Sequence, residues 1–176
     1  RYLRISHPPS QRTMSYRPHK RKKATTLKER AIEAIAANLN VCFKPGVLSL
    51  ELRCDILKYL CFSPELVHLP ADFFAGMKEL CFGGCSLQRG LLKQVAYEAG
   101  PTLLDLDLRQ CSGHEILLME GFQELCDRCS NLRRIDLVGV MTLTDSQLAM
   151  MHSCRNLHTV LLGGCIVLTP AAITSF

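Results

Sequence analysis

The sequence predicts an α/β fold in which repeated strand and helix units follow an N-terminal helical region. Two observations predict it. From residue 77 onward, four segments share one pattern of apolar residues, and stretches with the apolar spacing of helices separate them. Two further amphipathic segments precede the first of these four. With 176 residues, of which 48% are apolar, the chain is long enough for one domain with a sizeable core.

Residues 1–24 are predicted to form a disordered basic tail. Residues 1–25 carry eight of the 21 basic residues and no acidic residue, so the remainder holds 13 basic and 16 acidic residues, a net charge of −3. Prolines and the lack of apolar periodicity fit a segment that cannot build a core. The run RPHKRKK (Arg17–Lys23) fits a nuclear-localisation patch and equally a solvated charge run.

Charge and apolar pattern also bear on location and partners. No run of about 18 apolar residues occurs, so no membrane partner is expected. The N-terminus lacks the apolar stretch of a secretory signal, so we expect a nuclear or cytoplasmic protein whose ten cysteines stay reduced. Nucleic acid is not the expected partner because the folded part is mildly acidic; the alternative, binding through the tail, would be strongly salt-dependent.

The first amphipathic segment predicts a helix from Thr26 to about Asn40. Thr26 and Glu29 have the spacing of a capping box, in which each side chain bonds the backbone of the other residue. Apolar residues recur every four positions and so lie on one stripe: Leu27, Ala31 and Ile35, widened by Ile32, Ala34 and Leu39. Either the rest of the chain or a partner must cover this stripe.

A second helix is predicted over Leu48–Leu60, after a turn at KPG (Lys44–Gly46). A connector with two prolines then leads to the repeated segments. We therefore divide the chain into the tail, a helical region at 25–62 and a repeat region at 76–176. The apolar residues that give the second helix its spacing include Leu48, Leu52 and Ile56.

The four repeated segments begin 26, 29 and 25 residues apart. Each has apolar residues at relative positions 1, 4 and 6, and a Cys or Val at position 9. The segments are MKELCFGGC (Met77–Cys85), LLDLDLRQC (Leu103–Cys111), LRRIDLVGV (Leu132–Val140) and LHTVLLGGC (Leu157–Cys165).

This pattern resembles the cysteine-containing subtype of the leucine-rich repeat family over residues 76–176. The resemblance implies a short parallel strand and a helix in each repeat, stacked into a curved solenoid. It also implies that Cys85, Cys111 and Cys165 are buried in the turn after the strand, with the thiol near backbone groups, and that Val140 departs from the family. The N-terminal helices would then cap the first repeat.

No catalytic constellation stands out, so neither an enzyme nor a cofactor is expected. The chain has no glycine-rich phosphate loop and no nucleophile elbow, and its GGC motifs recur at repeat positions. Cys126 and Cys129 form a CxxC pair, but no second pair exists and Cys129 has a repeat position of its own, so no metal is expected.

Side chains in a strand alternate in direction, so residues between the buried positions should form the concave face of the repeats. This face carries more acidic than basic residues and could receive a basic peptide of an unknown protein substrate; a generic solvated face is the alternative. The residues expected on this face are Glu79, Asp105, Asp107, Arg134 and Asp136, with Arg109 just beyond.

The first helix resembles the elongin-binding box of the von Hippel–Lindau-box family of ubiquitin-ligase receptors. The matching residues are Thr26, Leu27, Ala31 and Ile35. The resemblance implies that Leu27 enters an apolar pocket of elongin C. Ala31 stands where the family usually has Cys, and Ser49 stands where the cullin-selecting box has Pro, which leaves the cullin open.

The order of box, turn, second helix and repeats is similar to the Zyg family of receptors. It implies a substrate-recognition subunit of a cullin-RING ubiquitin ligase, with elongin B/C and a cullin as partners. In this hypothesis the second helix, through Leu48, Leu52 and Ile56, contacts the cullin or caps the repeats.

Two alternatives stay open. One is a leucine-rich repeat scaffold without a ligase link, in which the stripe is packed against the first repeat; an exposed stripe favours the receptor. The other is a degenerate F-box that binds an F-box adaptor, because LSLELRCDILKYL (Leu48–Leu60) resembles the start of one, although the chain has no Trp. The chain begins with Arg1 and ends within a predicted helix, so we expect a fragment with further repeats after Phe176 and with Met14 as an alternative start.

Overall fold

A computed structural model describes residues 26–44, 46–61, 69–88, 90–112 and 119–176. The predicted basic tail and its nuclear-localisation run lie outside the described residues. So do Pro45 of the predicted turn and residues 62–68 of the connector.

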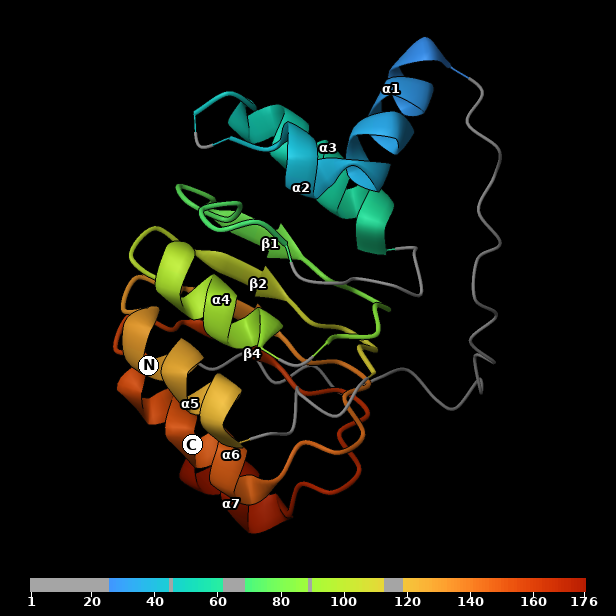
Figure 1. The fold of residues 1–176 in the computed structure, drawn as a ribbon. Coiled ribbons are helices and arrows are strands. Elements are labelled where there is room, and N and C mark those ends of the chain that lie inside the picture. Colours follow the sequence, from blue (N-terminus) through green and yellow to red (C-terminus); the bar gives the residue numbers. More distant parts are fainter. Residues whose placement is uncertain (1–25, 45, 62–68, 89, 113–118) are drawn as a thin grey trace.

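Four short strands form one parallel sheet in chain order, which confirms the α/β class (Figure 1). Glu79, Asp105, Arg134 and Thr159 are aligned across neighbouring strands, and each is the third residue of its repeated segment. The sequence repeat therefore sets the register. The strands are β1 (Glu79–Cys81), β2 (Asp105–Asp107), β3 (Arg134–Asp136) and β4 (Thr159–Leu161).

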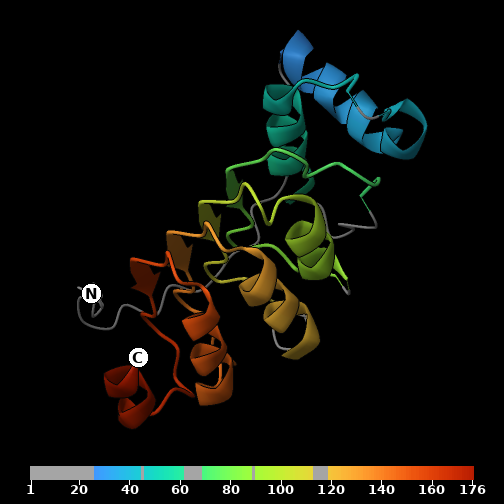
Figure 2. The same cartoon turned by 90° about the vertical axis from the view of Figure 1, so that its left-hand side faces the viewer.

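A helix follows each strand, and these helices lie side by side on one side of the sheet (Figures 1 and 2). They are α4 (Leu91–Glu98), α5 (Met119–Arg128), α6 (Asp145–Met150) and α7 (Pro170–Ser175), with a short 3-10 helix, η1 (Met151–Ser153), directly after α6.

The core lies between the sheet and these helices. Every residue at positions 1, 4 and 6 of the repeated segments is buried, as the pattern predicts. Leu80, Leu106, Ile135 and Val160 occupy the middle of their strands and point into the core, because neighbouring side chains in a strand alternate.

The turn after each strand buries the residue at position 9. The thiol of Cys111 donates to the carbonyl of Phe82 over 2.8 Å, and that of Cys165 donates to Leu137 over 3.2 Å. In both cases the acceptor belongs to the preceding segment, so the thiol ties neighbouring segments together. Burial raises the pKa of Cys165 to about 11 and that of Cys129 to about 12, so both thiols are protonated at neutral pH.

Three helices precede the sheet: α1 (Leu27–Ala37), α2 (Leu39–Cys42) and α3 (Leu50–Cys61). The capping box is present: the Thr26 hydroxyl accepts from the Glu29 N–H over 3.1 Å, and the Glu29 carboxylate accepts from the Thr26 N–H over 3.0 Å. The first helix ends earlier than predicted, because Asn38 leaves helical geometry and its side-chain amide donates to the Ala34 carbonyl.

The second predicted helix begins two residues later than expected, at Leu50. The Ser49 hydroxyl accepts a hydrogen bond from the Leu52 N–H over 3.2 Å, and the Ser49 carbonyl accepts from the Arg53 N–H. Ser49 thus bonds the free donors at the start of α3, as an N-cap residue does.

The helical region and the sheet share one core. α3 lies next to β1 (Figure 1), and Ile56 of α3 is fully buried. The Arg53 guanidinium donates to the carbonyls of Asp72 and Phe73 over 3.2 and 2.6 Å. Aromatic rings of Phe43, Phe73, Phe74 and Phe82 follow one another from α2 to the sheet, with centroids 5.4 to 6.1 Å apart.

Changing Thr26 to Ala should destabilise α1 by about 1 kcal/mol, because the hydroxyl of the capping box is removed. Amide hydrogen exchange will detect the change as faster exchange in the first turn of α1, at Glu29 and Arg30. The control is Thr142→Ala, at an exposed threonine after β3. Unchanged exchange in α1 would contradict the role of the capping box.

Candidate functional site

The first candidate surface is the outer side of α1. Leu27 is 86% exposed and Ala31 is also exposed, whereas Ile35 is half-buried. Ile32 and Leu39 are buried instead of widening the exposed stripe, and Ala34 is exposed. In a helix each step of four residues turns the stripe by about 40°, so Ile35 reaches the edge of the buried side while Leu27 faces solvent.

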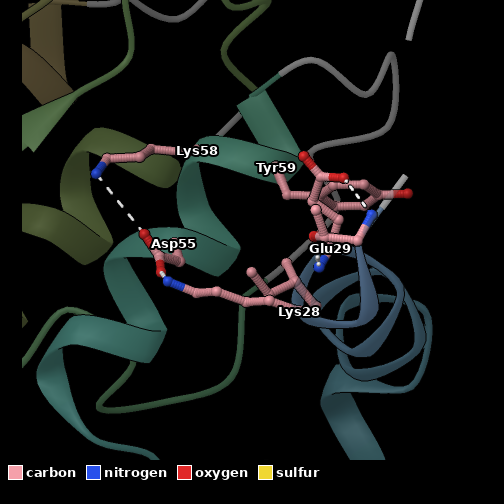
Figure 3. Close-up of a pocket in the computed structure, with 7 residues that line it drawn as sticks. Lys28, Glu29, Asp55, Lys58 and Tyr59 are labelled. Carbon is pink, nitrogen blue, oxygen red and sulfur yellow. Dashed lines mark hydrogen bonds and ion pairs between the residues drawn. The ribbon is translucent and has the colours of Figure 1, made fainter. Parts of the chain in front are cut away.

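An ion pair holds α1 against α3. The Lys28 ammonium lies 2.8 Å from one oxygen of Asp55, and Lys58 lies 3.8 Å from the other. The Lys28 hydrogen bond lowers the pKa of Asp55 below its ordinary value. The pair borders a hollow of about 350 Å³ between the two helices (Figure 3), lined by Thr26, Lys28, Glu29, Ile32, Asp55, Lys58 and Tyr59.

The residues predicted to contact a cullin or to cap the repeats are largely covered. Ile56 has no accessible surface, so it cannot contact a cullin and can only pack against the repeats. Leu48 and Leu52 are half-buried and pack against the core. Between α1 and the first turn of α3, the exposed large apolar residues are Val41, Val47 and Leu50, which the helical spacing of the sequence did not single out.

The second candidate surface is the outer side of the sheet, which we call the strand face. It differs from the exposed acidic face predicted from the sequence. Glu79 is exposed and Asp105 is half-buried, but Asp107 and Asp136 are 8% and 2% exposed. Asp107 and Asp136, predicted on the substrate-binding face, therefore present little surface to a partner in this structure.

Arginines from the same face cover the two buried carboxylates. The Arg109 guanidinium binds Asp107 with Nη2 at 2.7 Å and Nε at 3.0 Å, and its Nε lies 3.7 Å from Asp136. The Arg134 guanidinium bridges Asp105 at 3.1 Å and Asp136 at 3.0 Å. Both arginines predicted on the face are thus engaged with its carboxylates.

Asp107 and Asp136 also close the turns that follow their strands. Asp107 accepts from the N–H of Arg109 over 3.0 Å, and Asp136 accepts from the N–H of Val138 over 3.1 Å. An aspartate that bonds the backbone two residues ahead is typical of such turns. Their shared position 5 in segments two and three was the sequence signal for this structural role.

The pKa values of Asp107 and Asp136 are shifted in opposite directions. Burial alone would raise the pKa of Asp107, but the hydrogen bonds from Arg109 outweigh burial and the pKa is lowered. For Asp136 burial dominates and the pKa is raised, with a further contribution from the Asp107 charge.

Changing Asp107 to Asn should cost about 1.5–3 kcal/mol of folding free energy at neutral pH, because charge-assisted hydrogen bonds are lost. Changing Asp136 to Asn should cost less, because its ionised form is disfavoured by burial. The pKa of Asp107 is lower in the folded chain than in the unfolded chain. The contribution of Asp107 to folding stability is therefore fully present above the unfolded-state pKa of about 3.9, and it is lost as the pH falls through the folded-state pKa. The pKa of Asp136 is higher in the folded chain than in the unfolded chain. The contribution of Asp136 to folding stability is therefore fully present below the unfolded-state pKa, and it is lost as the pH rises through the folded-state pKa.

Urea unfolding of both variants at neutral pH and at about pH 3 measures these contributions. The deficit of Asp107→Asn should shrink in acid, whereas that of Asp136→Asn should not. Equal losses for the two variants at both pH values would contradict the assignment.

A groove of about 310 Å³ lies between α3 and the strand face. Its apolar lining comes from α3 and β1, and its charged lining comes mainly from β1 and β2. The groove is lined by Cys54, Leu57, Lys58, Glu79, Leu80, Cys81, Asp105, Asp107 and Arg134.

Within the described ranges, no group of three or more His, Cys, Asp or Glu side chains is arranged to hold a metal ion. No helix in that part of the chain has the length and apolar character needed to cross a membrane. Comparisons with protein-family models, with curated proteins and with solved structures yield no significant match to this chain.

Proposed function

We propose that this chain is a leucine-rich repeat protein and the substrate-recognition subunit of a cullin-RING ubiquitin ligase. In this proposal the four strand–helix units are stacked repeats of a solenoid, and α3 covers the first of them. Their consistent register and the buried residues at positions 1, 4, 6 and 9 support the solenoid. The unknown protein substrate binds on the repeats.

The exposure of Leu27 is the observation that carries the receptor hypothesis. α1 is anchored through Ile32 and the Lys28–Asp55 pair, yet its first turn presents a large apolar side chain to solvent. The exposed Ala31 on the next turn lets a partner approach the helix backbone closely. A long side chain beside a small one suits insertion into the apolar pocket of elongin C, with Ile35 at the edge of the contact.

A purely structural helix would not need this arrangement, because its apolar residues would face the core. α3 fits the covering role better: Ile56 and Leu57 are buried and Leu52 packs on the core. We therefore assign elongin binding to α1 and capping to α3. The exposed Val47 and Leu50 leave the start of α3 available to a cullin.

The mechanism of such a receptor is proximity. Elongin and the cullin would hold the chain near a charged ubiquitin-conjugating enzyme, and the substrate on the repeats would meet that enzyme at a high effective concentration. The chain itself would make and break no covalent bond.

Co-expression of the full chain with the elongin B–elongin C pair tests the proposal. A stable complex that stays together in gel filtration is the expected result. An F-box adaptor serves as the parallel arm, because it would be retained instead if α3 acted as a degenerate F-box. Retention of neither partner by a folded chain would leave a scaffold without a ligase link.

A further inference from the structure

The groove between α3 and the strand face combines an apolar wall with carboxylates. Leu57 and Cys54 line it from α3, and the exposed side chain of Cys81 lines it from β1. Glu79 and Asp105 face each other in the β1–β2 register, so their backbones lie about 5 Å apart. Two carboxylates therefore stand side by side next to an apolar surface.

The strand face is negatively charged around this groove. Its four carboxylates stand against two guanidinium groups, a formal charge of −2; the carboxylates are Glu79, Asp105, Asp107 and Asp136, and the cations are Arg109 and Arg134. The cations are already engaged, since Arg134 binds Asp105 and Asp136 and Arg109 binds Asp107.

The ion pairs of Arg109 and Arg134 do not include Glu79. It is exposed, and among the described residues it takes part in no ion pair. Lys58, on the opposite rim of the groove, lies 3.8 Å from Asp55, and within the described residues no ion pair joins Lys58 to Glu79. Glu79 thus places one negative charge of this excess at the end of the sheet nearest α3.

We propose that this groove binds a protein segment that inserts a single Lys or Arg side chain. The aliphatic part of the side chain lies along Cys54 and Cys81, and its charged end lies beside Glu79 and Asp105. Lys and Arg fit because their stems are apolar and only their ends carry charge. About 310 Å³ accommodates one long side chain and its neighbours, not a helix.

The role of this groove as a substrate site rests on the proposed function. The groove adds to that function the chemistry that the repeats would recognise, a basic side chain of the substrate. Asp107 and Asp136 are covered by arginines, so the carboxylates proposed to bind the basic side chain are Glu79 and Asp105 of the first two strands.

The test is NMR titration of the full chain with a blocked peptide, Ala-Ala-Lys-Ala-Ala. Saturable shift changes should gather at the amides of β1, β2 and the middle of α3. A matched peptide with Gln in place of Lys should cause much smaller changes. Glu79→Gln should weaken binding about fivefold, as expected for loss of one exposed ion pair, while Asp127→Asn, on α5, should leave it unchanged.

Two results would overturn the proposal: equal binding of the Lys and Gln peptides, or undiminished binding to Glu79→Gln. A third arm tests the chain's own basic run as the occupant, using a full chain with Lys20, Arg21, Lys22 and Lys23 changed to Gln. Peptide binding that appears only in this variant would assign the groove to that run and exclude a partner.

The titration contains no elongin, so its outcome is separate from that of the co-expression experiment. Peptide binding without an elongin complex would refute the ligase link and keep the groove. An elongin complex without peptide binding would keep the ligase link and refute the proposed groove site.

Discussion

Changing Leu27 to Asp is expected to abolish the complex with elongin B–elongin C while leaving the fold intact. Leu27 is 86% exposed, so the substitution removes almost no packing in the isolated chain. Surface changes of this kind alter stability by about 0.5 kcal/mol or less. In the complex the same residue would fill an apolar pocket.

The size of the effect follows from the burial of Leu27 in that complex. Burying a leucine side chain contributes about 1.5–3 kcal/mol, and forcing an unpaired carboxylate into an apolar pocket adds a penalty. Affinity should therefore fall at least about 100-fold. Isothermal titration calorimetry with the purified elongin pair measures this loss.

The matched control is Val41→Asp, because Val41 on α2 is 80% exposed and apolar but lies outside the proposed contact. It should bind as the unchanged chain does. Circular dichroism and urea unfolding verify that both variants are folded. If Leu27→Asp unfolds, or if both variants bind equally well, α1 is not the elongin-binding helix.

Changing Phe74 to Ala is expected to cost about 3–5 kcal/mol of folding free energy. The ring is fully buried and lies between those of Phe73 and Phe82, with centroid distances of 5.4 and 6.1 Å. Truncation leaves a cavity where the connector meets the first strand. It therefore weakens the packing that joins the helical region to the sheet.

Urea unfolding followed by far-ultraviolet circular dichroism measures the loss as a lower midpoint. Tyr97→Ala is the control, because Tyr97 is 52% exposed and its ring contacts the Arg128 guanidinium at 3.7 Å. That substitution should cost about 0.5–1 kcal/mol. A loss at Phe74 no larger than at Tyr97 would show that the helical region and the sheet do not share a core.

The core and the register were predictable from the sequence because local geometry determines both. A strand turns every second side chain to the same side, so Leu106 and Ile135 had to face one core once their segments were aligned. The capping box at Thr26 was predictable for the same reason, since both of its bonds join residues three positions apart. The turn positions of Cys111 and Cys165 were expected only from the resemblance to cysteine-containing leucine-rich repeats.

The candidate sites were predictable only in part. Alternation indicates that Asp107 and Asp136 leave the core, but it does not indicate how deeply they are covered. Arg134 lies 29 residues from Asp105 in the sequence, and the bridge it forms exists only because β2 and β3 are neighbours. The apolar spacing of α1 likewise fits two overlapping faces of the helix. It does not indicate which of these faces packs against the rest of the chain.

The sequence by itself determined the elements, their apolar sides and the alignment of the four segments, because these depend on the periods of the strand and the helix. Only the tertiary structure decided that Ile32 packs on α3 while Leu27 faces solvent, and that Glu79 alone among the acids of the strand face is exposed and without an ion pair among the described residues. Exposure and charge balance depend on which distant residues come together, and contacts between distant parts of a chain leave no period in its sequence.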